Sequence, residues 1–527
     1  MSVPVSVPLV APTPLAAFRA RAREAPERIA LVDFDGTRWT RARLLGETSA
    51  VMAGLQARGF AVGHRVIFAV RPGARLLVLA LAVHELGGVL VPQDPGVGDA
   101  LFRARIKDVA PRWVFAEGIL LARPGSLASR LLGWFGLRWA PLGEIPDATY
   151  IRVGRGIPGG AAATSYDVLR RAEAGTERSA NLRQPPDDAE AVLVPTSGTT
   201  QEPRVVIHTR RSLAAILTAV SRQLALTERD VLYARDLHLL LPALAAGATA
   251  VVPPGSRFAP ARVASLMAHW KVTHAFLVTR ECRLLLEYAE QRATTLPTSL
   301  RMLMIGAAPV RAGFLARLRP VLPGGCEALC VYGLTEALPI ARVSLEEKVA
   351  WRGDGDLVGA PIPGVHVRIR DDGQLVVSGE RVCSGYLGQP AAEEIATGDI
   401  ARLDEGRIVL LGRAKDMIIR GEHNIYPELY EPAIERIPGV RRAALIGDFD
   451  PVRADERVIL VVEREQGIAE ATLRKRVMDA LATGAHRIDA SATPDEVIFR
   501  TLPESGRSGK VDKAALRVAL GARSAIQ

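Results

Sequence analysis

Residues 194–206 read VPTSGTTQEPRVV, and this stretch is the strongest local indication of the fold in the chain. The apolar run Ala191–Pro195 predicts a buried strand that leads into a loop with four hydroxyl side chains around Gly198. Glycine lets a ligand approach the backbone closely, and consecutive N–H groups with Ser and Thr hydroxyls hold phosphate oxygens. No Gly-Lys-Ser/Thr follows at the spacing of a P-loop, so an ordinary polar turn is the alternative.

The segments around this loop alternate between strand and helix patterns. Upstream, Arg65–Val70 predicts a strand, Ala74–Leu86 a helix and Gly88–Pro92 a second strand, while His274–Val278 repeats the strand pattern downstream. From Val365 onward, short strands joined by Gly/Asp turns predict antiparallel pairing. We therefore expect an α/β fold, with a large N-terminal domain of mostly parallel sheets covered by helices and a small antiparallel, barrel-like part.

The C-terminal segment has a different pattern, because strands such as Val458–Glu463 and helices such as Tyr430–Ile437 and Ala469–Leu481 form a smaller α+β unit. The sequence predicts an N-terminal domain over residues 1–414 and a mobile, lid-like C-terminal domain over residues 415–527. A chain of 527 residues, 48% apolar and 24% charged, is long enough for such an arrangement.

The net charge of +10 does not indicate nucleic acid binding, because no run of five basic residues occurs and aromatic residues make up only 5%. No apolar run reaches the ~20 residues of a membrane span, although peripheral contact with a membrane stays open. Without a signal-peptide pattern, we expect the chain in the cytoplasm. Only seven of the 67 basic residues are lysine, so each lysine position is informative.

Three further segments carry groups suited to a nucleotide. Thr335 and Glu336 follow Tyr332-Gly-Leu and offer hard oxygen ligands for Mg²⁺, while the Tyr332 ring can stack on a base. Asp399 can accept hydrogen bonds from ribose hydroxyls, and Arg413 can hold ribose or phosphate. The third segment places a lysine in a Gly/Ser loop near the C-terminus. The alternatives are a surface turn, a hairpin with an exposed basic residue and a disordered tail.

In this order and spacing, the four segments resemble the adenylate-forming superfamily of acyl- and aryl-CoA synthetases, peptide-synthetase adenylation domains and luciferases. The resemblance covers nearly the whole chain. It implies that the chain binds ATP and Mg²⁺ with a carboxylic acid, and that it makes an acyl-adenylate with release of pyrophosphate. The acyl pocket is then expected around Asp236–Leu244, where His238 faces either the substrate or the core.

The resemblance also implies a role for each motif. It assigns the β- and γ-phosphates of ATP to Thr196, Ser197, Gly198, Thr199, Thr200 and Arg204. It assigns the adenine pocket to Gly306, Ala307, Ala308 and Tyr332, and the ribose to Asp399 and Arg413. It makes Glu336 the Mg²⁺ ligand, Thr335 a neighbour of the α-phosphate, Lys510 the bridge between acyl carboxylate and α-phosphate, and Lys415 the hinge of the C-terminal domain.

Some residues depart from the family pattern. In the phosphate loop, Gln201 and Val205 replace glycines and Arg204 replaces a lysine, so the positive charge is kept in a stiffer loop. Glu422 stands where CoA ligases usually have a glycine that lets the pantetheine arm pass. This bulky anion argues against CoA as the acceptor.

A narrower resemblance concerns the segments 94–98, 130–134 and 332–341, which read DPGVG, RLLGW and YGLTEALPIA. They look like the β-lactone synthetases of olefin biosynthesis, which adenylate a 2-alkyl-3-hydroxy acid and close a β-lactone without CoA. Two alternatives remain. One is a fatty acyl-CoA ligase that uses CoA or an acyl-carrier protein, and the other is an inactive homologue that acts as a binding protein.

Overall fold

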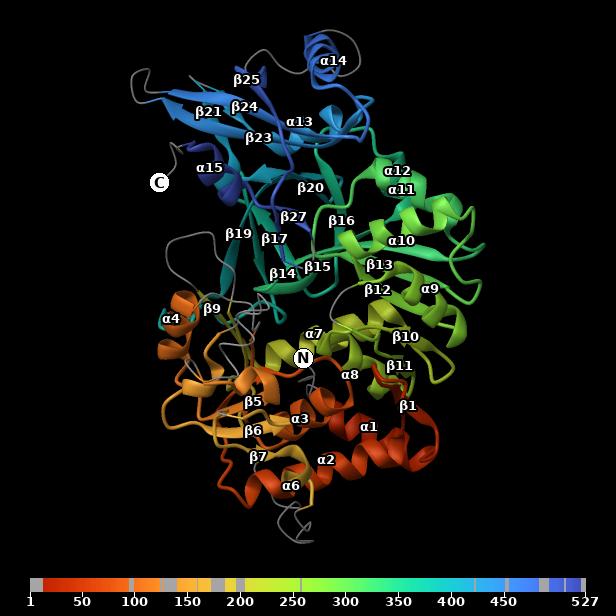
Figure 1. The fold of residues 1–527 in the computed structure, drawn as a ribbon, viewed down its shortest axis with the longest axis vertical. Helices are drawn as coiled ribbons and strands as arrows, with labels where there is room; N and C mark the ends of the chain where they lie inside the picture. Colours follow the sequence, from red (N-terminus) through yellow and green to blue (C-terminus); the bar gives the residue numbers. More distant parts are fainter. Residues whose placement is uncertain are drawn as a thin grey trace, which may run out of the picture.

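The computed structural model describes residues 13–93, 99–123, 126, 140–158, 160–171, 185–195, 204–255, 258–420, 423–450, 455–482, 492–506 and 509–522. Its largest sheet has thirteen strands (Figure 1). Pairing is parallel from β14 to β1 and antiparallel from β14 through β15 to β17, and the edge strand β2 also pairs antiparallel with β1. In spatial order these are β17 (His366–Ile369), β18 (Gln374–Ser378), β19 (Glu394–Asp404), β20 (Arg407–Arg413), β16 (Asp356–Pro361), β15 (Ala337–Ser344), β14 (Glu327–Leu334), β13 (Met302–Gly306), β12 (His274–Val278), β10 (Val231–Tyr233), β11 (Thr249–Val251), β1 (Ile29–Val32) and β2 (Arg38–Thr40).

A second sheet of seven strands is parallel except at β9, which pairs antiparallel with β8. The order is β7 (Thr164–Ser165), β6 (Thr149–Val153), β5 (Trp113–Glu117), β3 (Arg65–Ala69), β4 (Val89–Pro92), β8 (Glu190–Pro195) and β9 (Val205–Thr209).

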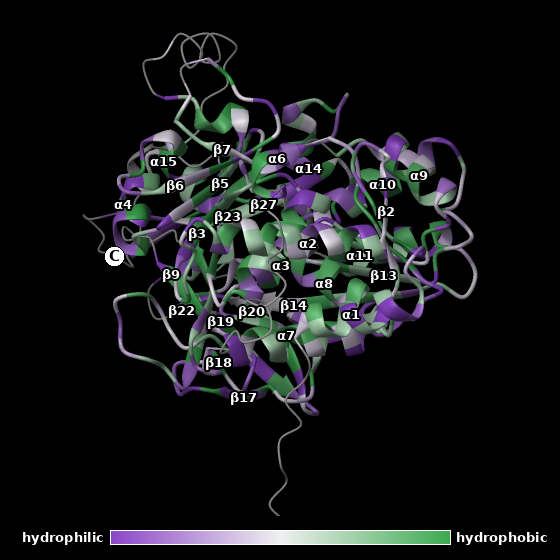
Figure 2. Cartoon of the chain, turned by 90° about the horizontal axis from the view of Figure 1, so that it is seen from below, coloured by the Kyte–Doolittle hydropathy of each residue, from purple (hydrophilic) through white to green (hydrophobic). Residues whose placement is uncertain are grey.

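Helices fill the space between the two sheets and cover their outer faces. One core cluster joins side chains of both sheets with the mostly apolar helix α3 (Figure 2). Ten of its twelve residues are buried, and nine of these ten are apolar. The helices of this part are α1 (Pro14–Glu24), α2 (Arg41–Gln56), α3 (Ala74–Glu85), α4 (Asp99–Val109), α6 (Tyr166–Leu169), α7 (Arg210–Leu224), α8 (Leu237–Ala246), α9 (Pro260–His269), α10 (Thr279–Gln291), α11 (Ala312–Leu318) and α12 (Leu345–Ala350).

The C-terminal segment forms a separate three-stranded sheet, drawn in blue in Figure 1, with its own apolar core. Its elements are β23 (Val440–Asp450), β24 (Asp455–Arg464), β25 (Glu496–Phe499), α13 (Pro427–Ile434), α14 (Glu470–Ala482) and α15 (Lys513–Leu520), with the hairpins β21 (Ile418–Arg420)–β22 (His423–Ile425) and β26 (Glu504–Ser505)–β27 (Lys510–Val511).

The mixed α/β fold and the change to antiparallel pairing agree with the sequence, with two local differences. Helix α13 begins at Pro427, three residues before its predicted start, because the first turn of a helix tolerates proline. Strand β8 alternates between buried and half-buried residues and is not buried throughout, since only one of its faces is fully covered. Across the described ranges, no helix is both long and apolar enough to cross a bilayer.

Candidate active site

A cavity of about 110 Å³ opens where the ends of β13 and β14 meet β16, β19, β20 and the hairpin β26–β27. This edge contains the carboxyl ends of parallel strands, where α/β sheets usually bind their ligands. Six residues that the sequence assigned to ATP or catalysis line the cavity, namely Ala307, Ala308, Tyr332, Asp399, Arg413 and Lys510. The structure therefore brings together motifs that lie 203 positions apart in the sequence, from residue 307 to residue 510.

Asp399 lines this cavity and is bound by two of its other lining residues. It faces Arg413 across β19 and β20, and the Arg413 Nε is 2.5 Å from its Oδ1. The Tyr332 hydroxyl donates to Oδ2 over 2.5 Å. Burial raises the pKa of Asp399, while the charge of Arg413 and the Tyr332 hydrogen bond oppose that shift. Both partners thus favour the ionised carboxylate, which can accept further hydrogen bonds.

Lys510 enters the cavity from β27, directly opposite Ser505 of β26. Burial lowers the pKa of its ammonium group, and the nearby charge of Arg413 lowers it further, whereas Glu428 and Asp399 act in the opposite direction. A second ion pair in the wall joins Lys348 and Asp356, whose Nζ and Oδ1 atoms are 2.7 Å apart. The cavity therefore holds charges of both signs close together.

The turn after β13 forms another wall. The Thr279 hydroxyl lies 3.3 Å from the Gly306 carbonyl and 3.0 Å from the Ala308 carbonyl, so it is shared between these two acceptors. Ala307 takes a left-handed conformation with φ of 67°. A Cβ on Gly306 would lie 2.9 Å from the Val331 carbonyl oxygen. Glycine is therefore required for the close approach of β13 to β14.

Thr335 and Glu336 lie outside the wall of this cavity, in a neighbouring cluster. The Tyr386 hydroxyl donates to Glu336 Oε1 over 3.1 Å, and the Arg204 guanidinium stands 5.1 Å from the centre of the Tyr386 ring. Burial, followed by the negative charge of Glu336, raises the pKa of Tyr386 to about 12, so its hydroxyl stays protonated. Tyr386 thus contacts Arg204 through its ring and Glu336 through its hydroxyl.

His208 of β9 connects this cluster to the strand that follows the predicted phosphate loop. Its Nε2 lies 2.7 Å from the Thr335 carbonyl oxygen, and because a carbonyl only accepts, Nε2 carries the proton. Burial lowers the pKa of His208, which keeps the ring neutral. Sequence reasoning missed both His208 and Tyr386, because no local pattern links them to residues 127 and 50 positions away.

The protein side chains around Glu336 supply only part of the ligands that a magnesium ion needs. Among the described residues, no three His, Cys, Asp or Glu side chains form a metal-binding group. Magnesium, however, usually takes one or two carboxylates together with phosphate oxygens and water. A single carboxylate at Glu336 fits that pattern.

Several predicted positions lie outside the described residues: the phosphate-loop residues Thr196, Ser197, Gly198, Thr199, Thr200 and Gln201, then Glu422 and the segments 94–98 and 130–134. Lys415 lies in the short 3-10 turn Ala414–Asp416 that follows β20. Burial lowers its pKa, and the neighbouring Asp416 opposes the shift.

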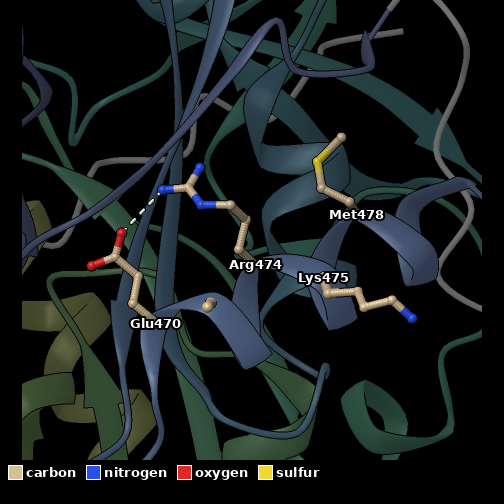
Figure 3. Close-up of a pocket in the computed structure, with 5 residues that line it drawn as sticks. Glu470, Arg474, Lys475 and Met478 are labelled. Carbon is tan, nitrogen blue, oxygen red and sulfur yellow. Dashed lines mark hydrogen bonds and ion pairs between the residues drawn. The ribbon is translucent and has the colours of Figure 1, made fainter.

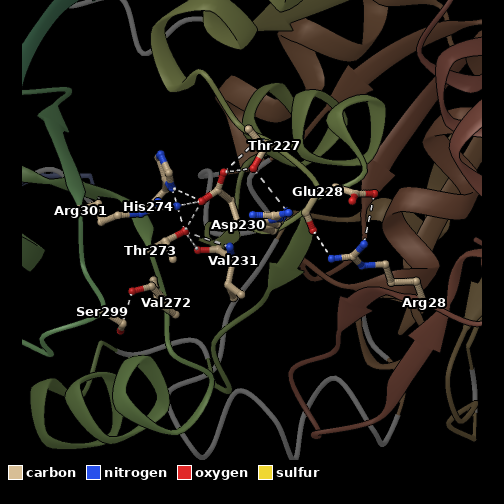
Figure 4. Close-up of polar contacts among 11 residues, drawn as sticks. Arg28, Thr227, Glu228, Asp230, Val231, Val272, Thr273, His274, Ser299 and Arg301 are labelled. Atoms are coloured by element: carbon tan, nitrogen blue, oxygen red, sulfur yellow. Dashed lines mark hydrogen bonds and ion pairs between the residues drawn. The ribbon is translucent and has the colours of Figure 1, made fainter.

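Two polar groupings away from the cavity have structural explanations. Asp230 is 3% exposed and accepts from the Thr227 backbone N–H over 2.8 Å, and it also pairs with Arg301 and lies 3.6 Å from His274 (Figure 4). These contacts close the amino ends of β10 and β12, the sheet edge opposite the cavity.

The other grouping is a shallow depression on α14 lined by Glu470, Arg474, Lys475 and Met478 (Figure 3). Its Glu470–Arg474 ion pair spans one helical turn over 3.1 Å, and Lys475 has a side chain that is 83% exposed. These features are typical of a solvated helix face.

Residues 18–387 match the model of the AMP-binding enzyme family. The chain belongs to this family. This confirms the resemblance to adenylate-forming enzymes, and the chain is an ATP-dependent, AMP-forming ligase or synthetase.

The relatives with similar sequences are named for different activities. The chain is 28% identical to feruloyl-CoA synthase of Amycolatopsis sp over 533 residues, covering 95% of this chain and 98% of that protein. It is 27% identical to olefin beta-lactone synthetase of Xanthomonas campestris pv. campestris over 526 residues, covering 88% and 89%. It is also 27% identical to a plipastatin synthase polypeptide of Bacillus subtilis, over 99% of this chain, but spans only 20% of that protein's length.

Solved structures of similar proteins have the same fold. Amide bond synthetase McbA from Marinactinospora thermotolerans superposes with a TM-score of 0.77 at 25% identity, covering 96% of this chain and 99% of that one. ATP-bound MatB from Rhodopseudomonas palustris gives a TM-score of 0.77 at 26% identity, covering 96% and 98%. The α/β architecture predicted from the sequence is thus that of adenylate-forming enzymes.

Proposed function

We propose that this AMP-binding enzyme activates an aliphatic carboxylic acid as its acyl-adenylate, and that a 2-alkyl-3-hydroxy acid then closes to a β-lactone. The observation that carries the first step is the convergence of Asp399, Arg413, Tyr332 and Lys510 on one cavity. Asp399 accepts hydrogen bonds from the ribose hydroxyls, Arg413 holds Asp399 ionised, and the Gly306–Ala308 turn lies along the adenine.

In the first step, an oxygen of the substrate carboxylate attacks the α-phosphorus of ATP. The new O–P bond forms as the bond to the β-phosphate oxygen breaks, and pyrophosphate leaves with the bonding electrons. Two anions must approach each other, so the step needs positioning and positive charge. Lys510 supplies a compact ammonium between the acyl carboxylate and the α-phosphate, and Arg204 with the 196–200 loop holds the leaving phosphates.

A magnesium ion held by Glu336 would supply charge neutralisation at the phosphates. Tyr386 fixes one oxygen of that carboxylate, and His208 fixes the backbone beside it at Thr335. The roles of these residues are therefore to hold the Glu336 carboxylate in one orientation.

In the second step, the 3-hydroxyl oxygen of the acyl-adenylate attacks its own acyl carbonyl carbon and closes the four-membered ring. The bond from that carbon to the phosphate oxygen breaks, AMP leaves with the bonding electrons, and the hydroxyl proton passes to solvent. The relationship to olefin beta-lactone synthetase supports this outcome, as does Glu422, where an anion opposes the pantetheine arm. The relationship to feruloyl-CoA synthase supports the second candidate, transfer of the acyl group to CoA. We place the division between the two domains at residues 414 and 415, with Lys415 as the hinge.

The deciding experiment measures pyrophosphate release with fatty acids and with 2-alkyl-3-hydroxy acids, each with and without CoA. Formation of a β-lactone without CoA supports the proposal, whereas strict dependence on CoA supports the ligase alternative. If neither aliphatic acids of any chain length nor aromatic acids cause pyrophosphate release, the chain is an inactive homologue with a binding role.

A further inference from the structure

The hairpin that carries Lys510 is anchored by one carboxylate on β26. Glu504 Oε1 is 2.6 Å from Arg442 Nη1, and Glu504 Oε2 is 3.3 Å from Arg280 Nε. Arg283 Nη2 lies 3.9 Å from Oε1. Arg442 belongs to β23 of the C-terminal segment, whereas Arg280 and Arg283 belong to α10. The carboxylate therefore joins the hairpin to a helix of the larger, N-terminal part.

The first turn of α10 is in contact with the active site at two points. Thr279 holds the carbonyls of Gly306 and Ala308 in the cavity wall, and the next residue, Arg280, holds Glu504. One helical turn thus contacts both the proposed adenine wall and the hairpin that inserts Lys510.

The hairpin backbone lies directly against Arg280. Gly509, with φ of 67°, precedes Lys510, and a Cβ there would lie only 2.6 Å from Arg280 Cδ. Arg442 also donates from Nη2 to the Gly509 carbonyl over 3.3 Å. Ser505, which pairs with Lys510, directly follows Glu504, so the ion-paired residue and the residue opposite the lysine are neighbours. A shift at Glu504 therefore moves Lys510.

We propose that Glu504 is a positioning residue for acyl-adenylate formation, and that its ion pairs with Arg280 and Arg283 fix the place of Lys510 in the cavity. The inference rests on the proposed function, in which Lys510 lies between two anions during the reaction. Such charge stabilisation is sensitive to distance, and a misplacement of ~1 Å can cost about 100-fold in rate. These ion pairs are partly exposed, with side-chain exposures of 18–42%, so they contribute little to folding stability.

The test compares Glu504→Gln and Arg280→Gln with the wild-type enzyme in acid-dependent exchange of pyrophosphate into ATP. We expect kcat to fall about ten-fold for Glu504→Gln and about three-fold for Arg280→Gln, while KM for ATP and the Kd measured by ATP titration change less than about two-fold. The matched control is Glu290→Gln, which removes the 2.7 Å ion pair between Glu290 of α10 and Arg317 of α11 and leaves the hairpin untouched. It should keep the wild-type kcat.

A wild-type kcat in both variants overturns the inference, as does a loss in which KM and Kd for ATP rise in proportion, because that result indicates general damage to the site. If Glu504→Gln fails to fold in a thermal melt, Arg280→Gln decides, since there Glu504 keeps its partner Arg442. Absence of exchange in the wild-type enzyme with every acid refutes the proposed function itself. Exchange in the wild type with unchanged variants refutes only the role of Glu504.

Discussion

Arg413 and Asp399 face each other across β20 and β19, with Nε and Oδ1 2.5 Å apart, in the wall of the cavity that Lys510 enters. Asp399 is only 3% exposed, and burial raises its pKa, while the charge of Arg413 is the largest influence in the opposite direction. The same arginine lowers the pKa of Lys510. One side chain therefore influences the charge of both the proposed ribose acceptor and the proposed catalytic ammonium.

We expect Arg413→Met to lower the free energy of unfolding by about 3 kcal/mol, because it leaves the Asp399 carboxylate buried without its cation. ATP binding should weaken as well, since the carboxylate then tends to protonate. Chemical denaturation and ATP titration measure the two effects. The control is Arg368→Gln, which breaks an exposed pair with Glu394 and should leave the free energy of unfolding nearly unchanged. Equal losses in the two variants would contradict the role of Arg413.

The lowered pKa of Lys510 predicts a particular pH dependence. In the proposed mechanism, adenylation needs the ammonium form of Lys510, so the rate should fall as pH rises through a pKa below the ~10.4 of an ordinary lysine. Lys510→Arg stays charged, and its slower reaction should lose this alkaline decline. Lys510→Ala should abolish adenylation and leave ATP binding largely intact. An identical alkaline decline in Lys510→Arg would assign the titration to another group.

The same shift has a consequence for stability. Between the lowered pKa and the ordinary pKa of lysine, the unfolded chain binds more protons at this position than the folded chain. The contribution of Lys510 to the free energy of unfolding should therefore rise with pH over that window. Comparing unfolding of the wild type and Lys510→Met across pH isolates this contribution, and a difference that does not vary with pH would refute it.

Gly306→Ala should separate β13 from β14, because the added Cβ meets the Val331 carbonyl oxygen at 2.9 Å. We expect a loss of about 1–3 kcal/mol in unfolding free energy and a higher KM for ATP. Gly313→Ala on α11 is the matched control, since its Cβ meets nothing within 4 Å and alanine favours helix. A thermal melt of both variants checks the comparison, and similar stabilities would disprove the crowding argument.

Tyr386→Phe removes the hydrogen bond to Glu336 Oε1 without changing the ring below Arg204. A hydrogen bond to a charged group is worth about 1.5–3 kcal/mol, so the magnesium concentration for half-maximal activity should rise roughly ten-fold or more. Tyr288→Phe, on the outer helix α10, serves as the control. An unchanged magnesium requirement would show that Tyr386 does not orient Glu336.

The order of motifs allowed the fold to be predicted. Ala308, Tyr332 and Asp399 line one cavity because they lie on or just after strands whose ends converge. The pairing of Tyr332 with Asp399 was not predictable, since it depends on which side chains burial brings together. The contacts of His208 and Glu504 were not predictable for the same reason. Their partners Thr335 and Arg280 are distant in sequence, and their own neighbours carry no recognisable pattern.

The two donors already bound to Asp399 also bear on nucleotide choice. Tyr332 and Arg413 each occupy one oxygen and leave the remaining lone pairs for two further donors. In the proposed complex, these two further donors are the ribose hydroxyls. A 2′-deoxyribonucleotide lacks one of them, so one lone pair of the buried Asp399 carboxylate has no hydrogen-bond donor. A site built to accept a hydroxyl rejects the analogue without it. The cavity should therefore discriminate ATP from 2′-deoxy-ATP through the sugar alone.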